Sequence, residues 1–245
     1  MKQIIWIWFR ILLKTTNMNK LKIASALFLV VSIVYVFGII FEISSLFLLK
    51  PFILLLLISM YLVSTSNLNY TYILALCFSL LGDVILMFSG ELYFIIGLLF
   101  FLVAHLFFIR IVLKRLNKTS LKTVVFSSLP FVIVYMLLLF FLKEFLSSML
   151  IPVIIYGFVI STFGSVALMV YFNNKTNESI LMLIGAIVFV LSDSILAINK
   201  FYFSAIYFEV LVMITYIMAQ YLIYKSMVLN QLNTRRNIKP SKLNN

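Results

Sequence analysis

The chain alternates long apolar runs with short polar segments, and this pattern predicts its elements. An α-helix needs about 20 apolar residues to cross the hydrocarbon core of a membrane, and eight runs approach that length. The polar segments between them are too short to form a separate soluble domain. The pattern therefore predicts an all-α fold, a polytopic transmembrane helical bundle, with spans at residues 22–40, 45–63, 70–88, 92–112, 123–142, 149–171, 179–198 and 204–228.

Two flanking segments differ from these spans. Residues 1–20 are basic and aromatic, and their apolar stretch is too short to cross a membrane. Trp6 and Trp8 favour a position at the level of the lipid headgroups, so we expect residues 1–20 to form an interfacial segment. Residues 230–245 are polar and basic, and we expect a disordered cytoplasmic tail. Residues 21–229 then form one eight-helix transmembrane domain.

The composition supports a membrane protein, since 64% of the residues are hydrophobic and the mean hydropathy is +1.19. The net charge of +12 would suggest a nucleic-acid partner in a soluble protein, but its distribution fits membrane orientation instead. Of the 19 Lys and Arg residues, all except Lys50, Lys143 and Lys200 fall on one side of the predicted membrane. This asymmetry predicts that both termini are cytoplasmic. The many Asn, Lys and Ile residues are typical of an AT-rich bacterial genome, which favours location in a bacterial plasma membrane.

Two carboxylates lie inside predicted spans. Asp83 belongs to the apolar run 76–87 and Asp193 to the run 187–196, and each follows Leu and a small residue and precedes a variable residue and Ile-Leu. An ionised Asp in hydrocarbon costs roughly 2.5–3.5 kcal/mol, so a membrane helix that carries one usually has a use for it. The two residues are candidates for one functional centre, and the alternative is a structural polar contact between helices.

Other polar residues are predicted to lie near these carboxylates. Lys50 in the second span and Glu209 in the eighth are expected at the same depth, unless they extend to the nearby interface. Residues 104–110 also match residues 219–225, which indicates a parallel duplication of a four-helix unit with a site at its interface. The remaining candidates for substrate binding or support share a helix face with these residues, adjoin them, or lie mid-span: Ser79, Ser192, Tyr216, Gln220 and the single histidine, His105.

The sequence offers little for cofactor chemistry. One histidine and one cysteine are too few for a zinc-type site, and the sequence contains no Gly-rich phosphate loop or Ser-His-Asp arrangement. We therefore expect neither a metal nor a cofactor.

Five short motifs, in order and in the expected spans, make the chain resemble the YhhN-like lysoplasmalogenase family of eight-span membrane proteins. The resemblance covers residues 22–228 and leaves out the two flanking segments. It is carried by Lys50-Pro51, Phe78–Asp83, Ala104-His105, Leu191–Ser194 and Thr215–Gln220.

The resemblance implies an enzyme, a lysoplasmalogenase that hydrolyses the vinyl ether bond of lysoplasmalogens. The products would be a fatty aldehyde and glycerophosphoethanolamine or glycerophosphocholine. Asp83 and Asp193 match the family's paired Asp positions and are the expected catalytic residues, while Lys50 is the candidate for the lipid phosphate. The expected partners are a lysophospholipid substrate and membrane lipid, with no nucleic acid and no obligatory protein partner.

This chemistry suits a pair of carboxyl groups. One protonated carboxyl can protonate the vinyl ether, and one carboxylate can stabilise the resulting oxocarbenium ion and activate water. The strongest alternative is a proton-coupled transporter of a small molecule or lipid that uses the same buried Asp pair. The spans contain few Gly or Pro interruptions, whereas broken helices are common in transporters. The sequence leaves open which Asp is the acid and which headgroup is bound.

Overall fold

The computed structural model of the protein describes the backbone of residues 2–116 and 119–241 and the side chains of residues 18–116 and 119–234. Within these residues all regular secondary structure is helical, which confirms the predicted all-α bundle. Eight α-helices and two short 3-10 helices follow one another: α1 Lys2–Ile40, η1 Ser44–Leu49, α2 Lys50–Ser64, α3 Tyr70–Ile85, α4 Glu91–Leu113, α5 Leu121–Leu142, η2 Ser147–Met149, α6 Leu150–Asn173, α7 Asn177–Phe201 and α8 Ile206–Ser241.

Seven stretches of the described residues are long and apolar enough to cross a membrane. The second of them, Ser44–Ser64, joins η1 to α2. The apolar helix α3 is shorter, and its 16 residues extend for about 24 Å at the helical rise. It ends at Ile85 rather than at the predicted residue 88, because the chain turns back toward α4 through residues 86–90. The eight predicted spans thus correspond one by one to the eight α-helices.

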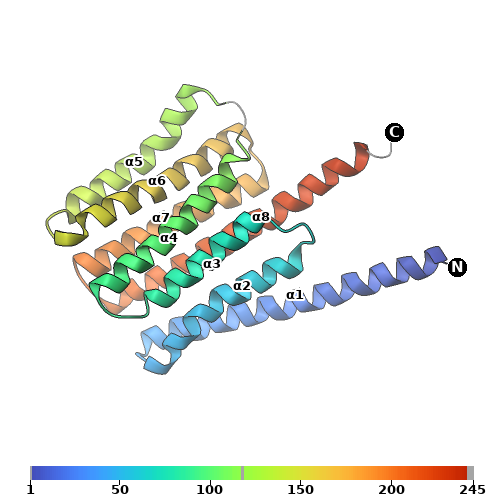
Figure 1. The fold of residues 1–245 in the computed structure, drawn as a ribbon, viewed down its shortest axis with the longest axis horizontal. Coiled ribbons are helices and arrows are strands. Elements are labelled where there is room, and N and C mark those ends of the chain that lie inside the picture. The colour runs from blue at the N-terminus through green and yellow to red at the C-terminus, as the bar shows by residue number, and fades with distance from the viewer. Residues whose placement is uncertain (1, 117–118, 242–245) are drawn as a thin grey trace.

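Successive helices run in opposite directions, so their connections alternate between two ends of the bundle (Figure 1). The terminal end bears both chain termini and the α2–α3, α4–α5 and α6–α7 connections. The site end bears the α1–α2, α3–α4, α5–α6 and α7–α8 connections. An even number of passes therefore returns the chain to the end where it began.

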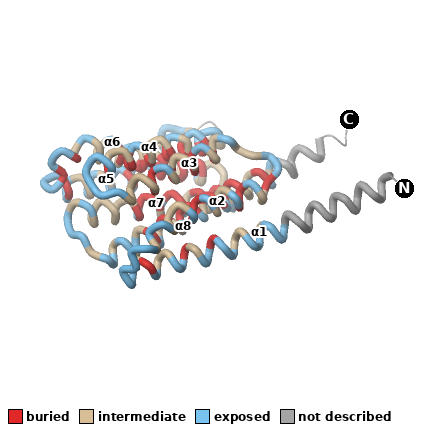
Figure 2. Tube along the Cα trace, turned by 60° about the horizontal axis from the view of Figure 1, so that its bottom comes forward, coloured by how far each residue is buried: buried red, intermediate tan, exposed pale blue. Residues whose placement is uncertain are grey.

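The helices differ in how deeply they are buried (Figure 2). α6 packs against α4, α5 and α7, and 61% of its most apolar stretch is buried. α5 packs mainly against α6 and α1 against α2 and α8, so both lie at the periphery, and only 11% of the apolar stretch of α5 is buried. The outward side chains of α5 are large and apolar, which suits contact with lipid chains.

Glycines bring paired helices close together beside the site. A Cβ at Gly82 of α3 would lie 2.7 Å from the Phe101 ring of α4, and Gly97 faces it from α4. Gly185 of α7 makes a similar close approach to α8, where a Cβ would lie 2.9 Å from the Ile223 side chain. Because these distances leave no room for a side chain, the glycines set the spacing of the α3–α4 and α7–α8 pairs. The predicted duplication of the two halves stays a prediction.

The two flanking segments continue the helices beside them. α1 runs without a break from Lys2 to Ile40, so residue 20 is not a helix boundary. α8 continues to Ser241, past residue 230 where the sequence predicted the start of a disordered tail, and residues 242–245 lie outside the described part of the chain. The interfacial position of residues 1–20 stays a prediction.

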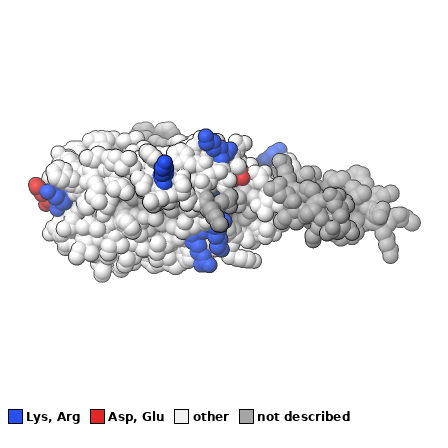
Figure 3. Space-filling model, turned by 90° about the horizontal axis from the view of Figure 1, so that it is seen from above, with Lys and Arg blue, Asp and Glu red and all other residues white. Residues whose placement is uncertain are grey.

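Basic side chains gather near the terminal end. On the face in Figure 3, Lys and Arg lie mainly toward the end from which the grey terminal segments extend. Lys114, Arg115 and Lys175 follow the terminal ends of α4 and α6, whereas Lys143 follows the site end of α5. This distribution is the one on which the predicted orientation, with cytoplasmic termini, depends.

We expect Gly82→Ala to lower the thermal stability of the protein in detergent, because the added methyl group would displace the Phe101 ring. Overpacking of this kind costs about 1–3 kcal/mol. Leu81→Ala in the same helix is the control, since Leu81 is 44% exposed. Melting temperatures followed by circular dichroism would contradict the packing argument if the Gly82 variant melted like the parent.

Candidate functional site

The two predicted carboxylates enter one small cavity near the site end of the bundle. Asp83 comes from the last turn of α3 and Asp193 from the second half of α7. The cavity has a volume of about 50 Å³. That is room for a few water molecules, since one needs about 10–15 Å³. Six helices contribute to its wall through Lys50, Asp83, Leu86, Phe94, Leu98, Phe101, Tyr156, Ser192, Asp193, Leu196, Val212, Met213 and Tyr216.

Asp83 is held by a cation and a hydroxyl group from two other helices. Its Oδ1 lies 3.4 Å from Nζ of Lys50, and its Oδ2 accepts a hydrogen bond of 2.7 Å from the Tyr216 hydroxyl. The residue is only 2% exposed, so these two groups replace the water that an ionised carboxylate would otherwise need. The ion pair favours the ionised form of Asp83.

Lys50 reaches Asp83 because of the way the second span begins. η1 ends at Leu49 and α2 starts at Lys50, followed by Pro51 in its first turn, where the missing amide hydrogen costs nothing. The side chain of Lys50 therefore leaves the very start of a helix at the site end. It also lines the larger cavity described below, so the predicted contact of Lys50 with a lipid phosphate stays a prediction.

Asp193 has a different partner. Its Oδ2 accepts a hydrogen bond from the hydroxyl of Tyr156 in α6, and no Lys or Arg among the described side chains forms an ion pair with it. Both carboxyl groups of the cavity thus accept a hydrogen bond from a phenol, but only Asp83 also lies beside an ammonium group. This difference suits Asp193, rather than Asp83, to carry a proton.

Tyr156 was missed by sequence reasoning. A tyrosine in an apolar span is common and carries no charge, so composition gives no signal for it. The depth of Tyr156 in the membrane does give a signal, because this residue lies seven residues into the predicted sixth span, close to the level of the two carboxylates. Counting residues from the span end could have found it.

Tyr216 and Gln220 form a short chain of hydrogen bonds that leads away from Asp83. Nε2 of Gln220 donates to the Tyr216 hydroxyl at 3.4 Å, and both residues are buried. Ser79 lies one turn before Asp83 in α3 and is fully buried, and its hydroxyl has no partner among the described residues. Gln220 thus supports the Asp83 side of the cavity through Tyr216, and neither Gln220 nor Ser79 forms a hydrogen bond with the Asp83 carboxylate within the described residues.

Two other predicted residues, Ser192 and His105, form hydrogen bonds with backbone groups of the surrounding helices rather than with the carboxylates. Ser192 lines the cavity, but its hydroxyl donates to the carbonyl oxygen of Val212 at 3.0 Å and so ties α7 to α8. His105 is fully buried, and its Nδ1 donates to the carbonyl oxygen of Phe101 at 2.8 Å. The His105 ring makes edge contacts with four aromatic rings, those of Phe108, Tyr156, Phe163 and Phe189.

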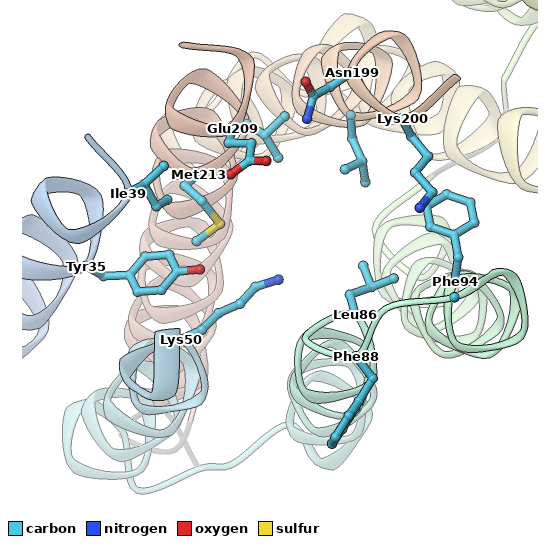
Figure 4. A pocket seen from close by; sticks show the side chains of 13 residues that line it. Tyr35, Ile39, Lys50, Leu86, Phe88, Phe94, Asn199, Lys200, Glu209 and Met213 are labelled. Atoms are coloured by element: carbon cyan, nitrogen blue, oxygen red, sulfur yellow. The ribbon is translucent and has the colours of Figure 1, made fainter. Parts of the chain in front are cut away.

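A larger cavity of about 310 Å³ opens next to the first at the site end (Figure 4). Glu209, the last predicted site residue, is exposed and lies here with Lys200, Asn199 and Tyr35, which sequence reasoning did not single out. We call this space the outer cavity and the smaller one the inner cavity. They adjoin because six residues line both: Lys50, Leu86, Phe94, Leu196, Val212 and Met213.

Comparison with known protein families matches residues 45–227 to the model of the YhhN family. The chain belongs to the YhhN family. No curated protein and no solved structure matches it. The YhhN match starts in η1 and ends in α8, so it includes every residue of the inner cavity. Tyr35 and Ile39 of α1, which line the outer cavity, precede it.

The chemical groups that this YhhN family member presents to the inner cavity are two carboxyls, one ammonium and two phenols. Among the described residues, no group of three or more His, Cys, Asp or Glu side chains could hold a metal ion. The arrangement can transfer a proton, stabilise a cation beside a carboxylate and hold a few waters.

We expect Lys50→Met to destabilise the protein by about 3 kcal/mol, because it leaves a buried carboxylate without its cation. Asp83→Asn should cost less, since the Lys50 side chain also borders the outer cavity and can reach water. The double variant should be more stable than the sum of the single effects predicts. Unfolding in mixed detergent with increasing SDS measures all three, and strictly additive losses would contradict a direct ion pair.

Proposed function

We propose that this YhhN family protein is a membrane hydrolase that cleaves the vinyl ether bond of lysoplasmalogens, 1-alkenyl glycerophospholipids with a single chain. The products are a fatty aldehyde and a glycerophospho-alcohol. The observation that carries the proposal is the pair of carboxyl groups that share the inner cavity but have different partners.

Vinyl ether hydrolysis needs these two different groups. The β carbon of the double bond must take up a proton, and the intermediate is an oxocarbenium ion that an anion stabilises. Glycosidases meet a similar demand with one protonated and one ionised carboxyl group. In the inner cavity, Asp83 beside Lys50 is the ionised group, and Asp193 beside the Tyr156 hydroxyl is the acid.

The steps balance with one water. Asp193 gives its proton to the β carbon, and the α carbon and the ether oxygen then share the positive charge. Asp83 stabilises this cation and accepts a proton from a water molecule as the water oxygen bonds to the α carbon. The carbon–oxygen bond of the hemiacetal to glycerol then breaks, the glycerol oxygen takes the proton of the hemiacetal hydroxyl, and the aldehyde forms. Proton return from Asp83 to Asp193 restores the starting state.

The supporting residues keep the two carboxyls distinct. Tyr216 fixes Oδ2 of Asp83 and is itself fixed by Gln220, so the carboxylate presents a constant face to the cavity. Tyr156 does the same for Asp193, and the edge contact of His105 with the Tyr156 ring restricts that ring. The glycerophospho part of the lipid would lie in the outer cavity, which has about six times the volume of the inner one, 310 against 50 Å³.

The first test is aldehyde release from 1-alkenyl lysophospholipids by purified protein in detergent. Asp83→Asn and Asp193→Asn should each lower the rate by at least about 100-fold, the usual contribution of a positioned acid or base. Glu144→Gln, an exposed carboxylate in the connection after α5, is the matched control and should keep the parent rate. Circular dichroism and melting curves must show that all variants are folded.

Two outcomes would contradict the proposal. Asp variants as active as the parent would exclude the acid–base roles. A well-folded parent that releases no aldehyde from either choline or ethanolamine substrates would exclude the hydrolase and favour proton-coupled transport.

Isotopes test the order of bond changes. In D₂O, the trapped aldehyde should carry one deuterium on the carbon next to the carbonyl, because that carbon receives the proton from the acid. In water enriched in ¹⁸O, the glycerol product should carry no label, since water attacks the alkenyl carbon. Label in the glycerol product, read by mass spectrometry, would mean that the other carbon–oxygen bond breaks.

A further inference from the structure

The outer cavity holds charges of both signs that no described residue neutralises. Glu209 of α8 and Lys200 of α7 line it, and neither forms an ion pair or a side-chain hydrogen bond within the described part of the chain. Figure 4 shows the carboxylate of Glu209 and the ammonium of Lys50 directed into the same open space. A cavity with unmatched charges of both signs is suited to a ligand that also carries both.

The three charged groups are not equivalent. Lys50 already pairs with Asp83 in the inner cavity. Nζ of Lys200 lies 5.3 Å from the centre of the Phe94 ring, which positions the ammonium group by a cation–π contact but satisfies none of its three N–H donors. Lys200 is therefore the cation available to an anion of the ligand. Glu209 is the anion available to a cation of the ligand.

We infer that the outer cavity is a subsite for a zwitterionic headgroup, in which Lys200 binds the phosphate and Glu209 binds a primary ammonium group. The inference rests on the proposed function for the identity of the lipid. It extends that function by assigning the headgroup: the protein prefers ethanolamine lysolipids over choline lysolipids.

The preference for ethanolamine follows from the donors that each headgroup offers. A primary ammonium has three N–H groups, and a carboxylate such as that of Glu209 accepts charge-assisted hydrogen bonds from them. A trimethylammonium has no N–H group and is recognised in proteins by cages of aromatic rings. The aromatic residues of the outer cavity are Tyr35, Phe88 and Phe94, and Phe94 already contacts Lys200. The cavity thus provides a carboxylate rather than a cage.

The position of the cavity agrees with the order of groups in the lipid. The outer and inner cavities meet at Lys50 and five apolar residues, so a headgroup in the outer cavity leaves the adjoining glycerol beside the entrance to the inner one. Lys50 there faces the boundary between the headgroup and the bond to be cleaved.

The test measures binding rather than turnover, so that it does not depend on the hydrolase activity. Native mass spectrometry of the purified full chain compares three 1-acyl lysolipids that have no vinyl ether: lysophosphatidylethanolamine, lysophosphatidylcholine and lysophosphatidic acid, which lacks the amine. The variants are Glu209→Gln and Lys200→Gln. The matched controls are Glu144→Gln and Lys143→Gln, in the connection after α5 at the same end of the bundle.

The expected pattern is specific to each charge. Glu209→Gln should weaken binding of the ethanolamine lipid by about tenfold, because the ammonium group of this lipid loses its carboxylate partner. Binding of lysophosphatidic acid, which has no ammonium group, should stay within about twofold of that to the parent. Lys200→Gln should weaken both by about tenfold, and the controls should change neither. The parent should bind the ethanolamine lipid more tightly than the choline lipid.

Other results overturn the assignment. An equal effect of Glu209→Gln on the lipids with and without an amine, or equal binding of ethanolamine and choline lipids by the parent, would exclude ammonium recognition by Glu209. The aldehyde assay fails or succeeds separately. The charge-specific binding pattern without aldehyde release would leave a headgroup site in a protein that is not a hydrolase, and aldehyde release without the pattern would leave a hydrolase without this subsite.

Discussion

A carboxylate inside a bundle of apolar helices must find a substitute for water, and the arrangement around Asp83 meets this requirement. A cation 3.4 Å away and a hydroxyl at 2.7 Å take the place of hydration for a side chain that is 2% exposed. Three local features bring these groups together. α3 stops two residues after Asp83, α2 starts at Lys50 after a 3-10 turn, and α8 supplies the hydroxyl of Tyr216. The close approach of α3 to α4 at Gly82 positions the end of α3, which carries Asp83.

The two carboxyl groups acquire different properties from their neighbours and not from their own identity. Both are aspartates in similar sequence motifs on helices that occupy similar places in the two halves of the chain. Each accepts a hydrogen bond from a phenol, but only Asp83 also has an ammonium partner, and on this difference the proposed division into carboxylate and proton donor depends. The proposed chemistry needs such a separation, since one carboxyl must be protonated while the other is ionised.

Much of the fold was predictable because hydrocarbon constrains sequence strongly. Each of the eight spans appeared as an apolar run, and the boundaries at α4 and α6 differ from the predicted ones by only a few residues. Asp83 and Asp193 were also identifiable, since an ionisable group in such a run is costly. Tyr156 was missed, because a tyrosine costs little in a membrane and only its depth in the sixth span distinguishes it. The sequence motif around His105 likewise could not distinguish a residue that touches a carboxylate from one enclosed by aromatic rings.

The outer cavity has one wall that contributes no residue to the inner cavity. Tyr35 and Ile39 belong to α1, which precedes the region matched by the YhhN family and packs mainly against η1, α2 and α8. Every other wall also carries or supports a residue of the inner cavity. Changes at Tyr35 or Ile39 would therefore alter the outer cavity without replacing any residue that lines the inner one. Under the proposed function, the first helix is the part of the molecule through which selection, or a protein engineer, would adjust which lipids are admitted without replacing a residue of the inner cavity.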